Sequence, residues 1–492
     1  MLNIIRSRDA WKQKAISRSR LIKNIKRRYG RLLLRWQRSS EENCSLRKEC
    51  EQLREALAHA QLPKVPPSEM MTMVMSVHLI VKARISFRSI PRVLSVMGFR
   101  GWIPHFTSAI NWVCRAGLGH LREVKSPLEE WIAIVDMTLD VAYKKALVVL
   151  RLPLSIFLKR EGAVTLEDIS CAGIQVRQSW KSEDVAQALQ EIIGNEPMLK
   201  AIIKDGGTDL GKGVRLWKQS QKRKDIFTIS DLGHEVANAL KADFKERASF
   251  KLITRKLKNN ATKIFQSRLA CLAPPKLRAK GRFMGISRLG NWIEKIQKLL
   301  GGPGRVHEGS LEAELRRLFG GFGNLTYMAR QLCQRSLLFA EMMKVLKTKG
   351  LNRETYQESM KIIEKLPKRS KSYKRISKWL TRHLHIQCRL SIAQTPLPVS
   401  SDIIESLFGT FKNFIARNPK AELNHLVLGI AALCGPQDIH TIHSRLEQVS
   451  HRDFLDWKKK EVGVTGKMER MRIFSQLASA EPDQKWDQLK SG

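Results

Sequence analysis

Three short apolar runs, each ending on an aspartate, constrain the fold of this chain more than any other feature of its sequence. They span residues 131–136, 199–205 and 225–231, and they end on Asp136, Asp205 and Asp231. Short runs that are rich in Ile, Val and Phe are typical of buried β-strands. Strand ends hold side chains over a crevice while the backbone stays anchored, so Asp136 and Asp205 are the first candidate site residues.

The segments between these runs predict a mixed α/β sheet. Residues 142–154 and 164–176 predict two more strands, and residues 182–193 predict a helix with Ser182 as its N-cap. The order along the chain is then strand, strand, strand, helix, strand, helix, strand. This order favours an α/β core that ends near Asp231.

Helical patterns dominate the rest of the chain. Residues 232–395 are helical in pattern and rich in Lys and Arg, with glycine-rich breaks at 301–304 and 320–323. Ser400 and Ser401 precede a helix at 402–416 that carries Glu405. The polar tail beyond Gly435 predicts one more helix, at 468–480.

The charge of the chain predicts a polyanionic partner. Lys and Arg number 88 and Asp and Glu 46, so the formal charge is 88 − 46 = +42, while 43% hydrophobic residues allow real cores. Such a surplus repels itself unless an anion neutralises it, and a nucleic-acid backbone offers the densest array of phosphates. An acidic membrane surface is the other candidate, although no apolar run reaches the roughly 18 residues that span a bilayer. Eight cysteines without a C-x-x-C pair predict reduced thiols in a cytosolic or nuclear-type compartment, and we expect a cytoplasmic protein.

The first 125 residues are expected to bind DNA. Residues 1–38 hold thirteen Lys or Arg and one acid among regularly spaced apolar residues, which predicts a basic amphipathic helix that is either a solvated arm or a phosphate contact. A seam at Leu46, Cys50, Leu53 and Leu57 predicts a short coiled coil or a docked helix. Residues 86–117 fit a helix-turn-helix whose second helix, 107–117, turns Arg115 outward toward DNA; a three-helix linker domain would look similar.

Three carboxylates carry the expected chemistry. Asp136 and Asp205 end strands, and Glu405 lies on the helix opened by the two serines. Clustered acids repel one another unless a divalent cation neutralises them, and Mg²⁺ prefers oxygen ligands. One or two such ions would activate a water or a 3′-hydroxyl and stabilise the leaving oxygen of a phosphodiester.

Longer motifs around these acids resemble a known family. They are Lys204-Asp205-Gly206-Gly207, Asp231-Leu-Gly-His234, and the serine-flanked helix from Ser400 through Glu405 to Lys412. Together they resemble the RNase H-like core of DDE transposases of the insertion-sequence type, over about residues 131–235 and 396–435, with a long helical insertion between. Pro398 and Ser401 stand where one branch of that family has Tyr and Arg, so the resemblance does not extend to that branch.

The resemblance implies a function and roles for individual residues. It implies metal-dependent cleavage and strand transfer of double-stranded DNA at transposon ends and target, by a prokaryotic-type, DNA-associated enzyme. Asp136, Asp205 and Glu405 would bind Mg²⁺ or Mn²⁺, while Asp231 and His234 would be accessory catalytic residues. Lys412, two helical turns after Glu405, would contact a DNA phosphate. Paired transposon ends, together with the seam, make a homodimer or higher oligomer the expected assembly.

The expected domains follow from these motifs. They are a basic helix and coiled coil at 1–62, a helix-turn-helix-like domain at 69–125, the RNase H-like core at 128–240 and 396–435, a helical insertion at 241–395, and a helical tail at 436–492. Within the insertion, Trp292 is either a core aromatic or a platform for an exposed base. His383, His385 and Cys388 are expected on a helix surface.

Two other functions stay open at the level of sequence. One is a non-catalytic DNA-binding protein on an RNase H-like scaffold, which metal-dependent strand nicking would distinguish from the enzyme. The other is a membrane-surface protein that uses the basic helix at 1–38, for which binding to vesicles would persist in excess DNA.

Overall fold

A computed structural model gives the fold of the chain. It describes residues 69–98, 103–123, 128–137, 144–275, 286–300, 309–319, 326–415 and 424–479, with seven single residues between 19 and 45. The chain divides into two units, 1–66 and 67–492, and the second unit holds every element discussed below. The predicted seam at 46–57, and almost all of the basic helix at 1–38, lie outside the described residues.

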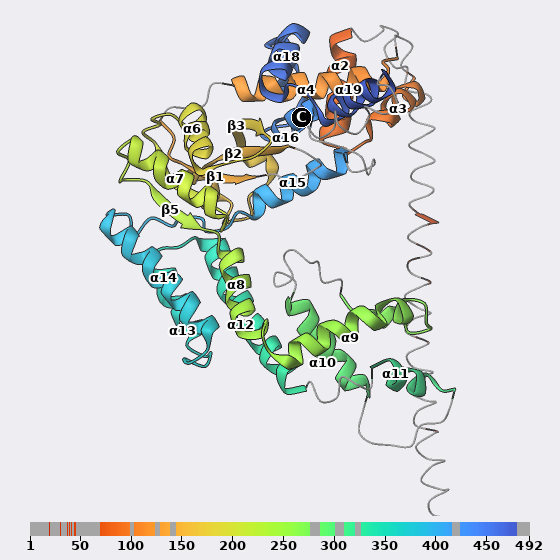
Figure 1. Ribbon diagram of the computed structural model, residues 1–492, viewed down its shortest axis with the longest axis vertical. Coiled ribbons are helices and arrows are strands. Elements are labelled where there is room, and N and C mark those ends of the chain that lie inside the picture. The colour runs from red at the N-terminus through yellow and green to blue at the C-terminus, as the bar shows by residue number, and fades with distance from the viewer. Residues whose placement is uncertain are drawn as a thin grey trace, which may run out of the picture. The chain divides into compact units, whose positions relative to one another are not determined.

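A five-stranded mixed sheet forms the centre of the second unit (Figure 1). Its strands are β1 (Trp131–Met137), β2 (Lys145–Pro153), β3 (Ser170–Arg177), β4 (Leu199–Lys204) and β5 (Phe227–Ser230). The order across the sheet is β3-β2-β1-β4-β5. Strands β1, β2 and β3 pair antiparallel, whereas β4 is parallel to both β1 and β5. The predicted α/β core is therefore confirmed.

Helices cover both faces of the sheet, because alternate residues of each strand are apolar on both sides. On one face, α6 (Ser182–Ile192) and α7 (Thr208–Ser220) bury Leu189 and Trp217 against β1 and β4. On the other face, Ile134 and Ile203 join a larger core that includes α8 (Leu232–Phe244) and α15 (Asp402–Ile415).

The edges of some elements differ from the prediction. A 3-10 turn, η2 (Leu166–Asp168), precedes β3, and a short helix, α5 (Leu154–Lys159), follows β2. Ser182 is not the N-cap of α6. Lys181 holds that position, its backbone N–H donates to Asp184 Oδ2 at 2.9 Å, and Ser182 is already helical.

The stretch between β5 and α15 is helical, as predicted. Besides α8 it contains α9 (Ala248–Phe265), α10 (Ile286–Leu300), α11 (Leu311–Phe319), α12 (Thr326–Lys349), α13 (Arg353–Ile363) and α14 (Lys371–Arg389), with the 3-10 turn η3 (Ala270–Leu272). A buried ion pair between Asp243 and Arg335 joins α8 to α12, and Asp243 also accepts a hydrogen bond from the backbone of Lys371 at 3.0 Å. The start of α14 is thus fixed to the end of α8.

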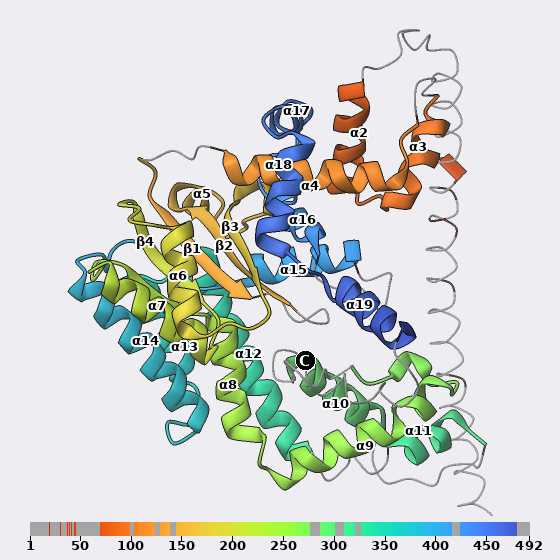
Figure 2. The ribbon, with the colours of Figure 1, turned by 45° about the horizontal axis from the view of Figure 1, so that its top comes forward.

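Helices from the two ends of the second unit pack together beside the sheet (Figure 2). The earlier ones are α2 (Glu69–Val81), η1 (Phe87–Ser89), α3 (Ile90–Val96) and α4 (Phe106–Arg122). The later ones are η5 (His425–Val427), α16 (Leu428–Ala432), α17 (Ile439–Glu447), α18 (His451–Trp457) and the π-helical turn η6 (Lys458–Val462). One more helix, α19 (Gly466–Ser479), follows them in the chain. The tail therefore holds more helices than the single one predicted.

Helix α4 is the centre of this packing and not an exposed recognition helix. It contacts α2, α16, α17 and α18, and Thr107 and Arg122 are its exposed residues. It also runs past the predicted end at Gly117. A Cβ at Gly117 or Gly119 would overlap the backbone of Leu428 or Arg445, so these glycines allow close helix packing where the sequence suggested a terminus.

Arg115 does not face outward, and that prediction is wrong. Its guanidinium donates to the backbone carbonyls of Leu446 and Val449, each at 2.9 Å. These carbonyls lie at the C-terminal end of α17, where backbone oxygens lack helical partners. Arg115 therefore satisfies the end of a neighbouring helix.

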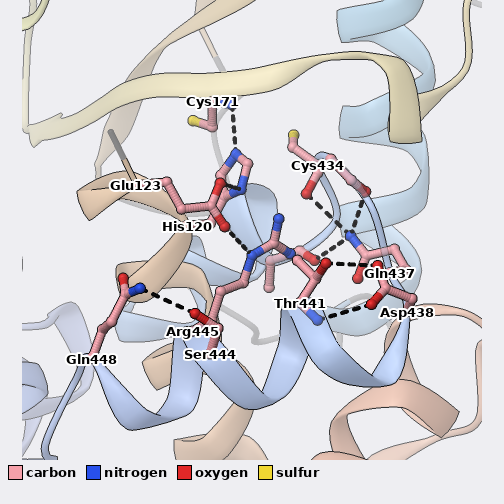
Figure 3. Close-up of polar contacts among 12 residues, drawn as sticks. His120, Glu123, Cys171, Cys434, Gln437, Asp438, Thr441, Ser444, Arg445 and Gln448 are labelled. Atoms are coloured by element: carbon pink, nitrogen blue, oxygen red, sulfur yellow. Dashed lines mark hydrogen bonds and ion pairs between the residues drawn. The ribbon is translucent and has the colours of Figure 1, made fainter. Parts of the chain in front are cut away.

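A buried polar network fixes the same helices to the sheet (Figure 3). His120 accepts a hydrogen bond at Nε2 from the backbone N–H of Cys171 in β3, at 2.9 Å, and its Nδ1 lies 3.1 Å from Glu123. Glu123 in turn pairs with Arg445 of α17 at 2.5 Å, and the Arg445 side chain is 2% exposed.

In the described part of the chain, no helix is long and apolar enough to cross a membrane.

Candidate active site

The sheet register brings three aspartates into one row. Val135 of β1 pairs with Lys204 of β4, which pairs with Ser230 of β5. The residues that follow these three in the chain are Asp136, Asp205 and Asp231, respectively. Because in-register residues of parallel strands point to the same face, the three carboxylates belong to one edge and one face of the sheet. The sequence predicted the three acids, and the strand order makes them neighbours.

Asp136 is held where a negative charge is costly. Burial raises its pKa to about 7, although a hydrogen bond from the backbone N–H of Met137, 2.7 Å long, opposes the shift. The charges of Asp205 and Glu405 raise the pKa further, and the charge of His234 lowers it. Glu405 belongs to a helix far along the chain, yet its charge acts on Asp136 and so on the row of aspartates.

His234 lies between two of the aspartates. Its Nδ1 is 2.9 Å from Asp231 Oδ2, and its Nε2 is 3.4 Å from Asp205 Oδ1. The hydrogen bond to Asp231 raises the pKa of His234 to about 9 despite partial burial, and the charge of Asp205 adds to the effect. The imidazolium thus supplies one positive charge to an otherwise acidic edge.

Asp231 has the surroundings of a fixed anion. It is the N-cap of α8 and accepts hydrogen bonds from the backbone N–H of His234 and of Ser401, both at 2.7 Å. Burial alone would raise the pKa of Asp231, but the hydrogen bonds from His234 and Ser401 outweigh it and lower the pKa. Asp231 therefore both caps α8 and bonds to the ring of His234.

Glu405 is positioned through the segment that precedes α15. The carbonyl of Val399 accepts from the backbone N–H of Leu232 at 2.9 Å, next to the bond between Ser401 and Asp231. The Ser401 carbonyl then accepts from the backbone N–H of Glu405 at 3.3 Å, which starts the helix. Burial raises the pKa of Glu405, the charge of His234 opposes the rise, and the charge of Asp231 adds to it.

The donor set at this edge fits a divalent cation in its chemistry. Asp136, Asp205 and Glu405 provide hard oxygen donors, and burial together with neighbouring acids raises the pKa values of Asp136 and Glu405, so that their ionised forms are costly without a cation. Among the residues that the structure describes, no three His, Cys, Asp or Glu side chains are grouped closely enough to hold a metal ion. Binding would therefore require the carboxylates to draw together around the ion.

The remaining predicted site residues have different outcomes. Lys412 lies on α15 with Glu405 and is half-buried, and its contact with DNA stays a prediction. Trp292 is 9% exposed, donates from Nε1 to the carbonyl of Leu272 at 2.9 Å and packs edge-on against Phe319. Its indole is a core aromatic of the insertion, so the first of the two alternatives is confirmed and the base-stacking platform is wrong.

His383 is a supporting residue that the sequence did not reveal. It is buried in α14, stacks on Trp379 at 4.1 Å and bonds through Nδ1 to the carbonyl of Trp379 at 2.8 Å. Its Nε2 accepts from the backbone N–H of Ser230 at 3.4 Å. The prediction of a surface position is wrong for His383, which fixes the insertion to the last residue of β5.

Comparisons with known proteins add one distant likeness. No family model matches the chain, and no curated protein matches it. Among solved structures, the chain is similar to one described as the Drosophila P element transposase strand transfer complex, with a TM-score of 0.39 and 11% sequence identity, over 78% of this chain and 97% of that chain. A likeness at this level does not define the fold or the function of the chain.

Proposed function

We propose that this chain is a DNA-cutting and DNA-joining enzyme of the DDE transposase type, built on an RNase H-like core. The observation that carries the proposal is the row Asp136–Asp205–Asp231, with Glu405 acting electrostatically on Asp136. The strand order, with antiparallel β2 and β3 on one side of β1 and parallel β4 and β5 on the other, supports the RNase H-like part.

The residues have distinct roles in this proposal. Asp136, Asp205 and Glu405 would hold Mg²⁺ or Mn²⁺, which when bound activates a water or a 3′-hydroxyl for attack on a phosphodiester. His234 keeps a proton between Asp231 and Asp205 and so orients the Asp205 carboxylate. Asp231 orients the ring of His234 and docks the start of the helix that carries Glu405.

The charge of the chain supports DNA as the substrate. The chain carries a formal charge of +42, while the candidate site is acidic, so phosphates would be attracted to the chain and cations would be held at the site. Lys412 would contact a phosphate from the Glu405 helix. In this proposal the DNA is a transposon end and then a target, and paired ends would be held by a homodimer or higher oligomer.

Strand nicking tests the proposal directly. The purified full chain is mixed with supercoiled plasmid in Mg²⁺, in Mn²⁺ or in EDTA, and open-circle and linear products are measured. We expect metal-dependent nicking that Asp136→Asn, Asp205→Asn and Glu405→Gln each abolish, with DNA affinity retained. Asp209→Asn, an exposed carboxylate in the first turn of α7, is the matched control and should nick normally.

The same assay separates the enzyme from a non-catalytic DNA-binding protein. Tight binding of the plasmid without any metal-dependent product would favour the non-catalytic function. Full nicking activity in any one of the three carboxylate variants would overturn the assignment of that residue.

A further inference from the structure

One face of α14 carries a continuous line of positive charge. From residue 365 to residue 401 the chain contains no Asp or Glu. Because an α-helix turns by about 100° per residue, the six Lys and Arg side chains of α14 all lie within an arc of about 100°. All six are exposed, and we call them the basic stripe: Lys371, Lys374, Arg375, Lys378, Arg382 and Arg389.

The opposite side of α14 holds the helix in place. It packs against α8, α13 and β5 (Figure 1), and Trp379 and His383 are buried there. His383 accepts a hydrogen bond from the backbone N–H of Ser230 in β5 at 3.4 Å, and Arg375 bonds to Glu235 of α8 at 2.9 Å. The stripe is therefore displayed by a helix that is fixed beside the β5 edge of the sheet.

Acids of the protein neutralise little of the stripe. Arg375 pairs with Glu235, but within the residues that the structure describes the other five members form no ion pair. The acids that flank the stripe in the sequence are Glu364 and Asp402, and Asp402 is paired instead with Lys347 of α12. Cations on successive turns of a helix repel one another, so an anion that lies along the stripe would stabilise it.

The side chains of this face favour a phosphate backbone over a protein or a membrane. No large apolar side chain of α14, which the structure describes throughout, is exposed. Protein interfaces have apolar and aromatic residues at their centre, and helices that bind membrane surfaces insert such residues into the lipid. The exposed face of α14 offers neither feature. A nucleic-acid backbone needs only cations repeated along a line.

The length of the stripe suits a duplex. Helix α14 has 19 residues from Lys371 to Arg389, which is about 28 Å at 1.5 Å per residue. One strand of a duplex carries a phosphate every 3.4 Å or so along the axis, so this length spans about eight phosphates. Five unpaired cations over that distance can each contact a different phosphate, without reading any base.

We propose that the basic stripe of α14 binds the sugar–phosphate backbone of duplex DNA without sequence preference. The choice of DNA rests on the proposed function, which this inference deepens by assigning a surface to the substrate. The stripe acts in binding and not in the chemical step. It holds the duplex beside the β5 edge of the sheet, away from the reacting phosphodiester.

The test measures DNA affinity without metal. Binding of two 40-base-pair duplexes of unrelated sequence to the full chain is followed by fluorescence anisotropy in EDTA, from about 50 to 200 mM salt. The stripe variant is Lys374→Gln/Lys378→Gln/Arg382→Gln.

A second triple variant is the matched control. Lys159→Gln/Lys295→Gln/Arg452→Gln removes the same two Lys and one Arg from exposed positions that are scattered over α5, α10 and α18. Melting temperatures of both variants should match that of the unmodified chain, since the altered side chains are exposed.

The expected result is a change in salt dependence. Each lost phosphate contact reduces the log–log salt slope by about 0.9, so the stripe variant should lose about 2.7 and bind at least roughly tenfold more weakly at 100 mM salt. The loss should be equal for the two duplexes, because backbone contacts carry no sequence information. The control variant should lose less than half as much.

Equal slopes for the two triple variants would overturn the stripe as a DNA-binding surface, and so would a loss confined to one of the two duplexes. Unchanged DNA affinity of the stripe variant, together with lost binding to phosphatidylserine vesicles, would overturn it in favour of a membrane surface.

Nicking of supercoiled plasmid separates this inference from the proposed function. A reduced slope in a chain that does not nick DNA supports the stripe and contradicts the catalytic proposal. Equal slopes for the two triple variants, with metal-dependent nicking intact, overturn the stripe alone. Absence of any DNA binding by the unmodified chain overturns both.

Discussion

The buried carboxylate of Asp231 accepts a hydrogen bond from the backbone N–H of Ser401, 170 residues later in the chain, at 2.7 Å. One residue thereby connects the helix that carries His234 to the helix that carries Glu405. Because the second oxygen of Asp231 bonds to the backbone and ring of His234, the position of both groups depends on a single side chain that is 2% exposed.

Replacing Asp231 with Asn should therefore loosen both helices. The amide has one acceptor oxygen, and its NH₂ group would face an N–H donor, which leaves buried donors unsatisfied. We expect a loss of about 1–3 kcal/mol in the free energy of unfolding, measured by chemical denaturation. The pKa of His234 should also fall from its raised value, because the hydrogen bond to Asp231 is the main cause of the rise.

An exposed aspartate provides the control for this variant. Asp456→Asn on α18 removes a carboxylate from the surface, and it should change the free energy of unfolding by less than about 0.5 kcal/mol. An unchanged His234 titration in Asp231→Asn, followed by NMR, would contradict the positioning role.

The stability of the metal-free chain should depend on Asp136 and on pH. Its pKa is raised from 3.8 to about 7, so between these values the folded state keeps a proton that the unfolded state has lost. The contribution of Asp136 to stability should therefore fall as pH rises from about 4 to 7 and stay low above 7, and comparison with Asp136→Asn isolates this contribution. In EDTA, Asp136→Asn should raise the melting temperature at pH 8 and have no such effect near pH 4.

A divalent ion should offset the destabilisation that ionised Asp136 causes, and it should do so in the unmodified chain but not in Asp136→Asn. Mg²⁺ or Mn²⁺ needs the ionised carboxylate, so its stabilising effect should increase as pH rises through 7. Equal metal stabilisation of the unmodified chain and Asp136→Asn at pH 8 would remove Asp136 from the ligand set.

The buried His383 and the half-buried His425 should make the fold sensitive to mild acid. Burial lowers the pKa of His383 and of His425 from 6.5 to about 4. Between these values the unfolded state holds protons that the folded state lacks, so the contribution of these two histidines to stability should fall as pH decreases from about 6.5 to 4, opposite in sign to that of Asp136. Replacing both residues with Phe should flatten this dependence, measured by denaturation at several pH values, whereas His451→Gln at an exposed position should leave its slope unchanged.

Local patterns in the sequence were sufficient for the strands and for the acids that end them. The β-branched runs before Asp136, Asp205 and Asp231 are shorter than the helical segments and lack their 3.6-residue period. The strands of the α/β core can therefore be predicted from local sequence alone. The register that makes these residues neighbours does not, because it depends on which strands pair across the sheet. The row of aspartates is thus a property of the tertiary structure.

The errors have a common physical origin in distant partners. Arg115 was predicted to face outward because the carbonyls that it binds lie more than 330 residues away. His383 was predicted on a surface because its partner Ser230 belongs to another element. Gly117 suggested a helix end, since a glycine that allows close packing has the same local sequence as one that allows a turn.

Loss of the buried ion pair at Arg445 should lower the free energy of unfolding more than loss of an exposed ion pair nearby. Glu123→Ala leaves the Arg445 guanidinium, 2% exposed, without its carboxylate, and should cost about 3–5 kcal/mol. Adding Arg445→Met should recover part of that loss, because an apolar side chain needs no counter-ion. Arg122→Ala breaks an exposed pair between α4 and Asp453 of α18, 3.1 Å long, and should cost at most about 1 kcal/mol. Equal losses for Glu123→Ala and Arg122→Ala in chemical denaturation would mean that Arg445 is hydrated in solution and that the network does not hold α17 to α4.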